Sequence, residues 1–251
     1  MTKLHVLPAG RCGVAASMLD MTRPDHSLVN LPVWCYLLET TDGPILIDTG
    51  MPDHCVSHPD LFASPGEEPS IVPHMDPEDG IVPILARAGY TPRDVACVVS
   101  THRHFDHAGG NRHFGEVELI LQQLEYDAMV ADLEAPDAFD FWSSPDLRYR
   151  LIQGDYALAP GIKLLFTPGH SVGHQSVLVE TPTTGSVLLT IDAAYQAANY
   201  EEGIPFAVAD AQKAQASIAK LRSIAQSEKS YVFFGHDIRQ ERTVKPYPAF
   251  Y

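Results

Sequence analysis

The amino-terminal half of the chain alternates between short apolar runs and turn-forming residues, which is the pattern of a β-sheet. Residues 33–39 form one apolar run and residues 44–48 form another, with the turn signal Thr41-Asp42-Gly43 between them. This pair of runs predicts a β-hairpin. Other apolar runs of strand length lie at residues 4–7, 95–99, 118–121, 151–152, 162–166, 175–180, 186–191 and 231–234.

Helical patterns occupy fewer segments. Residues 76–89 predict a helix, with Asp76 as its cap and Gly89 past its end. Residues 122–133 have helical composition, and residues 210–227 carry an apolar face at helical spacing. Because no linker splits the chain, we expect a single α/β domain over residues 1–251.

Residues 51–76 are rich in Pro, His, Ser and Asp and predict a long loop, of the kind that often covers an active site. Two apolar residues, Leu61 and Phe62, lie within it. They either cap a hydrophobic pocket or pin the loop to the core, and pinning is the favoured interpretation.

A chain of 251 residues with 45% hydrophobic content can bury a large core. Its formal net charge of −15, with only 17 Lys and Arg, argues against nucleic acid or an acidic membrane as a partner. The start of the chain has no signal-peptide core, and no apolar run approaches membrane-spanning length. The cysteines are far apart with no CxxC pair, which favours a reducing cytoplasm.

The densest polar signal is the segment His102-Arg103-His104-Phe105-Asp106-His107, which follows the strand expected at residues 95–99. In extended backbone His102 and His104 point to the same side, whereas Asp106 and His107 can face a second point as the chain turns. Imidazole nitrogens and carboxylate oxygens at this spacing suit a cation such as zinc, and they are too many for one tetrahedral ion. A polar surface loop is the alternative, which four potential ligands in six residues disfavour.

Three further polar residues lie where apolar runs end: His170, Asp192 and His236. One such residue is weak evidence, because it can be a turn former, but three of them bring the candidate ligands to seven. That number fits two metal ions that share a bridging carboxylate. Asp48 also ends a run, and it is either a turn residue or an anchor for the free ring nitrogen of a ligand histidine.

The order and spacing of these motifs resemble the metallo-β-lactamase superfamily, since HxHxDH is followed by PGHSxGH, a lone Asp192 and GHD. Longer stretches are similar to N-acyl homoserine lactonases of the quorum-quenching type, and the resemblance runs over nearly the whole chain. These stretches are PAGRC at 8–12, LPVWCYLLE at 31–39, HFDHAGGN at 104–111, LLTIDA at 188–193 and FFGHD at 233–237.

The resemblance implies an αββα sandwich, in which two mixed β-sheets lie face to face with helices outside and the site at one edge. The metal ligands that it implies are His102, His104 and His170 for one ion, Asp106, His107 and His236 for the other, and Asp192 as the bridge. It implies two divalent ions, with zinc expected, although the ligand types also suit manganese, iron or cobalt. A homodimer is expected at the level of the family.

The implied reaction opens the lactone ring of N-acyl homoserine lactones by attack of a hydroxide that bridges the two ions. Tyr195 matches the family's active-site tyrosine and is expected to donate to the tetrahedral intermediate. Asp106 is the candidate that protonates the leaving alkoxide. The candidate substrate-binding residues are Phe62, Phe105, Ala207 and Val208.

Two departures from the family pattern concern the acyl pocket. Val208 stands where close relatives carry glycine, and residues 13–23 are not a clean copy. We therefore expect the width of the pocket to differ at these positions.

The main alternative is another hydrolase of the same superfamily, such as a thioesterase of the glyoxalase II type, which would share every metal ligand. It would need basic residues near the carboxyl terminus for its thiol cofactor, and Arg239, Arg242 and Lys245 are available. A metal-binding protein with a dead site would lack a ligand or the tyrosine, and none is missing. Of the other histidines, we expect His5 on the surface and His174 in a structural role.

Overall fold

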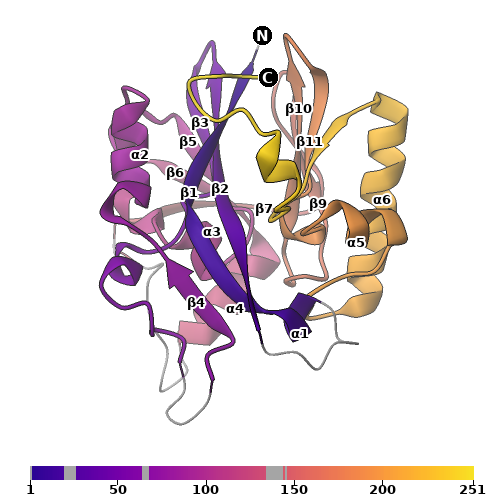
Figure 1. Ribbon diagram of the computed structural model, residues 1–251. Helices are drawn as coiled ribbons and strands as arrows, with labels where there is room; N and C mark the ends of the chain where they lie inside the picture. The colour runs from indigo at the N-terminus through magenta and orange to yellow at the C-terminus, as the bar shows by residue number, and fades with distance from the viewer. Residues whose placement is uncertain (1, 20–26, 64–67, 134–143, 145) are drawn as a thin grey trace.

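Two β-sheets lie face to face in the computed structural model, and helices cover their outer faces (Figure 1). The structure describes residues 2–19, 27–63, 68–133, 144 and 146–251. The larger sheet contains, in spatial order, β4 (Ile71–His74), β1 (Lys3–Ala15), β2 (Leu28–Thr40), β3 (Gly43–Ile47), β5 (Cys97–Val99), β6 (Glu118–Gln122) and β7 (Arg148–Ile152). The smaller sheet contains β12 (Tyr231–Phe233), β11 (Gly185–Leu189), β10 (Gln175–Thr181), β9 (Ile162–Phe166) and β8 (Tyr156–Ala159).

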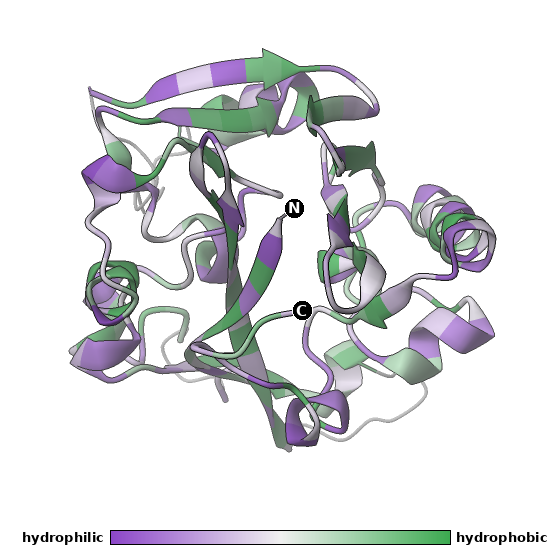
Figure 2. Cartoon of the chain, turned by 90° about the horizontal axis from the view of Figure 1, so that it is seen from above, coloured by the Kyte–Doolittle hydropathy of each residue, from purple (hydrophilic) through white to green (hydrophobic). Residues whose placement is uncertain are grey.

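The α-helices are α1 (Ala16–Leu19), α2 (Ile81–Arg87), α3 (Phe105–Ala108), α4 (Gln123–Leu133), α5 (Ala197–Glu202) and α6 (Ala211–Glu228). Helix α2 packs on the outer face of the larger sheet and α6 on that of the smaller one, whereas α1 lies at the ends of strands β1 and β2 (Figure 1). The view from above shows the same layers (Figure 2). The predicted αββα layering is therefore confirmed. Among the described residues, no helix is both long and apolar enough to cross a membrane.

Strand pairing in the larger sheet brings the chemically interesting segments to one edge. The predicted hairpin is present, because β2 pairs antiparallel with β3 from Tyr36 opposite Ile47 to Thr40 opposite Gly43. Strands β3, β5 and β6 are parallel, so their carboxyl ends reach the same edge. Parallel pairing therefore places Asp48, which follows β3, beside the histidine segment that follows β5.

Strand pairing in the smaller sheet likewise brings two polar residues, Asp192 and His236, to one edge. Its strands β9, β10 and β11 are antiparallel, but β11 and β12 are parallel, with Leu189 opposite Phe233. Asp192 follows the end of β11 and His236 follows the end of β12. Two residues that are far apart in sequence thus lie together at this sheet edge.

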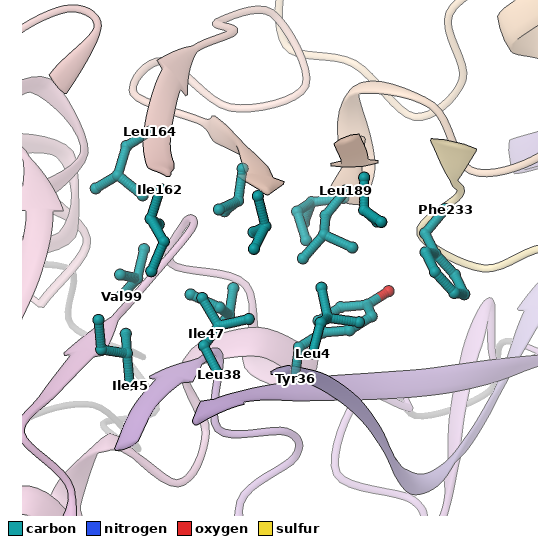
Figure 3. Close-up of a cluster of buried hydrophobic side chains, with 14 of the residues drawn as sticks. Leu4, Tyr36, Leu38, Ile45, Ile47, Val99, Ile162, Leu164, Leu189 and Phe233 are labelled. Carbon is teal, nitrogen blue, oxygen red and sulfur yellow. The ribbon is translucent and has the colours of Figure 1, made fainter. Parts of the chain in front are cut away.

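The space between the sheets is filled by buried apolar side chains from both (Figure 3). Tyr36 and Leu38 of β2 lie across from Leu189 and Phe233 of the smaller sheet, and the rings of Tyr36 and Phe233 are 6.2 Å apart. A second apolar cluster packs the outer face of the larger sheet against α2, and a third packs the smaller sheet against α6. Each sheet is thus apolar on both faces.

The helix expected over residues 76–89 is interrupted at Gly80, so the prediction of one continuous helix is wrong. Before Gly80, the side chains of Asp76 and Asp79 each accept a hydrogen bond from the other's backbone N–H, which caps the amino-terminal end of the 3₁₀ turn η2 (Pro77–Asp79). Gly80 itself is extended, with φ −65° and ψ 148°, and α2 begins after it. The reciprocal cap closes one turn and leaves the backbone free to change direction.

We expect Leu164→Ala to lower the free energy of unfolding by about 2–5 kcal/mol, because it leaves a cavity between the two sheets. Leu164 lies in β9 and is fully buried. Urea unfolding followed by fluorescence measures the change. The control is Leu124→Ala on α4, where the leucine is 54% exposed and the loss should stay below about 0.5 kcal/mol. Equal losses in the two variants would contradict the location of the core.

Candidate metal centre

The histidine segment leaves the edge of the larger sheet after β5 and turns into α3. Thr101 fixes its start, since the Thr101 backbone N–H donates to Asp48 Oδ1 at 2.8 Å and the Thr101 hydroxyl donates to Asp48 Oδ2 at 2.8 Å. His102 is buried, His104 occupies the N-cap position of α3 without a side-chain capping bond, and Asp106 and His107 are buried within that helix. A Cβ on Gly109 would lie 2.3 Å from the backbone nitrogen of Pro52, so glycine allows the end of α3 to pack this closely.

Three imidazole nitrogens converge on one point. His102 Nε2 lies 3.0 Å from His104 Nδ1 and 3.2 Å from His170 Nε2, and the last two atoms are 2.8 Å apart. Asp192 Oδ2 lies 3.3 Å from His170 Nε2. Within the described part of the chain, these four residues form a group whose ligand atoms all lie within 4.8 Å of one another, close enough to hold a metal ion.

A second group of this kind contains Asp106, His107 and His236. Asp106 Oδ2 lies 3.6 Å from His107 Nε2 and 3.7 Å from His236 Nε2. Asp192 turns its other oxygen, Oδ1, to the same two nitrogens, at 3.2 and 3.1 Å. One carboxylate thus faces both groups, and all seven candidate ligands from the sequence lie together.

The arrangement fits bound cations. A ring nitrogen that carries a proton has no lone pair left to accept a hydrogen bond, so three mutual contacts cannot all be hydrogen bonds. Without a cation, at least one pair in the triangle of His102, His104 and His170 faces either lone pair to lone pair or N–H to N–H. His107 Nε2 and Asp192 Oδ1 are also buried without a hydrogen-bond partner, which is costly for polar atoms.

Protonation states favour metal binding in the first group. Burial lowers the pKa of His102 well below its usual value, and the neighbouring imidazoles add to this effect. Burial also lowers the pKa of His170, against the opposing charge of Asp192. Burial raises the pKa of Asp192, but the histidines around it outweigh burial and hold this pKa well below its usual range. Neutral imidazoles and an ionised carboxylate are the forms that bind a cation.

Asp48 orients His107 in the second group. It is fully buried after β3, and its Oδ2 accepts a hydrogen bond from His107 Nδ1 at 2.8 Å. This bond turns His107 Nε2 toward Asp106 and Asp192. Burial would lower the pKa of His107, but the three carboxylates outweigh it and raise this pKa well above its usual value, so a cation here competes with a proton. The interpretation of Asp48 as a histidine anchor is confirmed.

The residue before Asp192 has an unusual backbone conformation. The strand expected at residues 186–191 ends at Leu189, and Asp192 lies in the 3₁₀ turn η5 (Ile191–Ala193). Ile191 has a φ of 51°, a region that branched residues avoid because of steric strain. A Cβ on Gly235 would lie 2.6 Å from the carbonyl oxygen of Ile191, so only glycine lets the end of β12 approach η5.

His174 has the structural role that we expect from the sequence. The backbone N–H of Asp192 donates to His174 Nε2 at 3.1 Å. The other ring nitrogen of His174 lies 2.9 Å from Thr167 Oγ1. Since Nε2 accepts, the ring proton resides on Nδ1, and the imidazole connects the Thr167 strand end to η5.

A cavity of about 590 Å³ lies beside the two groups. Its polar lining comes from Arg103, His104, Asp106, Asp132, His170 and Tyr195. Its apolar lining comes from Cys12, Val14, Met18, Phe62, Ile71, Phe105, Ala207, Val208 and Ala209. All four candidate substrate-binding residues line it, and so do Val14 and Met18 of the segment 13–23, whose residues 20–23 lie outside the described part of the chain.

The long segment 51–76 both packs on the core and reaches the cavity. Leu61 packs with the apolar cluster on the outer face of the larger sheet. The ring of Phe62 lies 4.3 Å from that of Phe105. The segment also contains β4, an unpredicted strand that pairs with β1. Leu61 therefore pins the loop to the core, and its neighbour Phe62 covers the cavity.

Tyr195 lies between the two groups. Its ring centroid is 4.9 Å from that of His236 and 5.6 Å from that of His170. Burial raises the pKa of Tyr195 well above its usual value, and the negative charges of Asp192 and Asp106 add to the rise. The hydroxyl therefore keeps its proton and can donate at neutral pH.

A larger hollow, of about 800 Å³, lies apart from this cluster, with Pro8, Trp34 and Glu241 among its lining residues. The seven candidate ligands all belong to the described residues, and none of them lines it. The basic residues Arg239, Arg242 and Lys245 are described as well, and none lines the smaller cavity.

Two sequence inferences need correction or addition. His5, expected on the surface, is only 3% exposed, because its Nδ1 lies 2.9 Å from the carbonyl oxygen of Ala249 near the carboxyl terminus. Asp237 of the GHD motif is buried, and its carboxylate accepts from the backbone N–H groups of Ala197 and Arg239. The buried carboxylate of Glu125 is marked by no sequence motif.

The fold and the paired groups define the class of protein. The sequence profile of the Metallo-beta-lactamase superfamily matches residues 28–236. The N-acyl homoserine lactonase of Bacillus cereus is 48% identical over 248 residues, which cover 99% of this chain and 98% of that relative. The lactonase AttM of Rhizobium johnstonii is 31% identical over 260 residues, with the same coverage of 99% and 98%.

Solved structures agree with the sequence comparisons. An N-acyl homoserine lactone hydrolase with N-hexanoyl-L-homoserine bound at its catalytic metal center has a TM-score of 0.93 and 47% identity, covering 99% of this chain and 98% of that one. A mutant of Bacillus thuringiensis AiiA with N-decanoyl-L-homoserine bound has a TM-score of 0.93 and 46% identity, with the same coverage. The chain belongs to the N-acyl homoserine lactonases of the metallo-β-lactamase superfamily, as the resemblance predicts.

We expect Asp48→Asn to weaken divalent metal binding about 10–100-fold. The NH₂ of the asparagine amide must face either His107 Nδ1 or the backbone N–H of Thr101. Both of these groups are donors, so one hydrogen bond that holds His107 or Thr101 in place is lost. Titration of the metal-free protein against a chromophoric chelator measures the affinity. Asp42→Asn, in the exposed turn between β2 and β3, is the control for the same loss of charge. Unchanged affinity in Asp48→Asn would contradict the anchoring role of Asp48.

Proposed function

We propose that this protein hydrolyses the lactone ring of N-acyl homoserine lactones to the ring-opened N-acyl homoserine. The observation that carries the proposal is the position of the two ligand groups beside a cavity whose remaining lining is mostly apolar. Such a cavity suits a substrate with a polar ring to be cleaved and an acyl chain to be buried. The relatives, at 48% and 31% identity, are N-acyl homoserine lactonases.

The proposed metal ligands are those that the family resemblance implies: His102, His104 and His170 for one ion, Asp106, His107 and His236 for the other, and Asp192 for both. We propose zinc as the metal, because its borderline character suits imidazoles combined with carboxylates, although manganese, iron and cobalt accept the same donors. When bound, the two ions supply Lewis acidity and make water acidic enough to act as a nucleophile near neutral pH.

The side chains at the cavity have separate proposed roles. Tyr195 holds a proton at its hydroxyl oxygen and donates a hydrogen bond to the oxyanion of the tetrahedral intermediate. Asp106 lines the cavity and is the proposed carrier of the proton that the leaving alkoxide takes up. The apolar residues Phe62, Phe105, Ala207 and Val208 receive the acyl chain and exclude water from it.

The thioesterase alternative is disfavoured by the placement of Arg239, Arg242 and Lys245 outside the cavity lining.

We also propose a cytoplasmic location, which the four free cysteines support. The proposal takes residues 1–251 as one domain, because one apolar cluster joins strands of both sheets. A homodimer stays a prediction from the family resemblance, and light scattering would measure the oligomeric state.

The purified protein is expected to open N-acyl homoserine lactones of several chain lengths, with about two metal ions per chain, and to lose this activity on chelation. Acid release in a pH-stat and elemental analysis of the same sample measure both properties. S-D-lactoylglutathione and a cephalosporin serve as comparison substrates. Cleavage of the thioester without cleavage of lactones would be consistent with the proposed metal centre but would contradict the proposed lactonase activity.

We expect Tyr195→Phe to lower kcat about 10²–10³-fold with a smaller change in KM, because it removes a donor to the developing negative charge. Steady-state kinetics on one lactone measure the effect. Tyr200→Phe is the matched control, since the Tyr200 hydroxyl is buried without a hydrogen-bond partner. A kcat in Tyr195→Phe equal to that of the control would rule out the proposed role.

A further inference from the structure

Glu125 lies in α4, outside the seven candidate ligands, and its side chain is fully buried. Its Oε1 accepts from the backbone N–H of Arg103 at 3.0 Å and from Arg103 Nη1 at 3.1 Å. Its Oε2 accepts from Ser171 Oγ at 2.8 Å and from the backbone N–H of Gly173 at 2.7 Å. Four donors on one carboxylate match the ionised form, which only accepts hydrogen bonds.

These donors belong to the two loops that carry one ligand group. Arg103 lies between His102 and His104 in the loop after β5 of the larger sheet. Ser171 and Gly173 follow His170 in the loop after β9 of the smaller sheet. One backbone hydrogen bond, from Gln175 N–H to Thr101 O at 3.1 Å, already joins these loops, and Glu125 joins them again directly beside the histidines.

The fit between α4 and the second loop is close. A Cβ on Gly173 would lie 2.5 Å from the backbone nitrogen of Glu125, so any other residue there would push the loop away from α4. The loop is thus held both by hydrogen bonds to the carboxylate and by direct packing on the helix. His170 therefore belongs to a loop that is fixed to α4 at Glu125.

We propose that Glu125 is a positioning residue that sets the distance between His170 and the pair His102 and His104, and thereby the metal affinity of this group alone. The inference rests on the ligand assignment in the proposed function. Asp48 bonds to the ring of His107 in the other group and also, through Thr101, to the start of the segment that carries His102. The residues that donate to Glu125, in contrast, all lie beside ligands of the first group, and both carboxylates are buried anchors. Such anchors typically change metal affinity about 10–100-fold when they are altered.

Glu125→Gln tests the role without a change of shape. Each carboxylate oxygen receives one backbone N–H, from Arg103 on Oε1 and from Gly173 on Oε2. Whichever way the amide is oriented, its NH₂ opposes a backbone donor of one loop. The substitution therefore loosens one of the two loops, whereas Asp127→Asn, two residues further along α4 at an exposed position, removes the same charge without touching either loop.

The experiment is titration of the metal-free proteins with Zn²⁺, and with Co²⁺ followed by visible absorption. Wild type and Asp127→Asn should bind two ions alike. Glu125→Gln should keep one ion at wild-type affinity and bind the other about 10–100-fold more weakly. In the double variant Glu125→Gln/Asp48→Asn, the binding of the remaining ion should weaken as well, because Asp48 orients His107 in the second group.

Several results would overturn the inference. Two ions at wild-type affinity in Glu125→Gln would do so, and so would equal weakening of both ions, which a general loosening of the fold predicts. Should Glu125→Gln not fold, Ser171→Ala removes a single donor and must still weaken one ion selectively; unchanged affinity there also overturns the inference. A wild-type protein that binds no metal would overturn the proposed centre itself, whereas failure of lactone hydrolysis alone would leave this inference standing.

Discussion

The structure depends on the burial of several carboxylates and imidazoles in one place that water scarcely reaches. A buried ion without compensation costs several kcal/mol, so each of these groups needs a donor or a cation. Asp48 and Glu125 find protein donors on both oxygens. Asp192 finds instead the edges of histidines from both groups, and the nitrogen triangle beside it cannot be satisfied by protons alone. The fold is therefore organised around the positive charge that this cluster requires.

Strand direction is what brings the cluster together. The parallel pairs β3–β5 and β11–β12 deliver Asp48 beside His107, and Asp192 beside His236, although each pair is far apart in sequence. The chain accepts strain at the ends of these strands, since Asp48 has a φ of 60° and Ile191 a φ of 51°. Such conformations cost about 1–3 kcal/mol each and persist only where the surroundings over-determine them. Here the contacts of the Asp48 and Asp192 carboxylates hold the backbone in these conformations.

The sequence predicts the parts of this arrangement that are local. The hairpin, the central strands and the seven candidate ligands follow from apolar runs and from polar residues at the ends of those runs. What it cannot predict depends on partners distant in the chain. Nothing near His5 indicates that Ala249 will cover it, and β4 is hidden in a segment rich in proline because only β1 makes it a strand. Glu125 is a single acidic residue on a helix, and no local pattern sets it apart. Its proposed role comes from contacts with two loops that are distant in sequence, at Arg103 and Gly173.

Each ligand group has both members that line the cavity and members that do not, which bears on how the centre meets a substrate. His102 and His107 are buried away from the cavity lining, whereas His104, Asp106 and His170 line it beside Tyr195. In the proposed centre, the buried histidines would hold the ions in place, and the cavity residues would face the substrate. Because Asp106 and His107 lie in the same short helix, α3, the position of the cavity-lining Asp106 carboxylate is set by an anchored neighbour. The anchor of His107, Asp48, therefore controls the geometry of a surface that it does not itself reach.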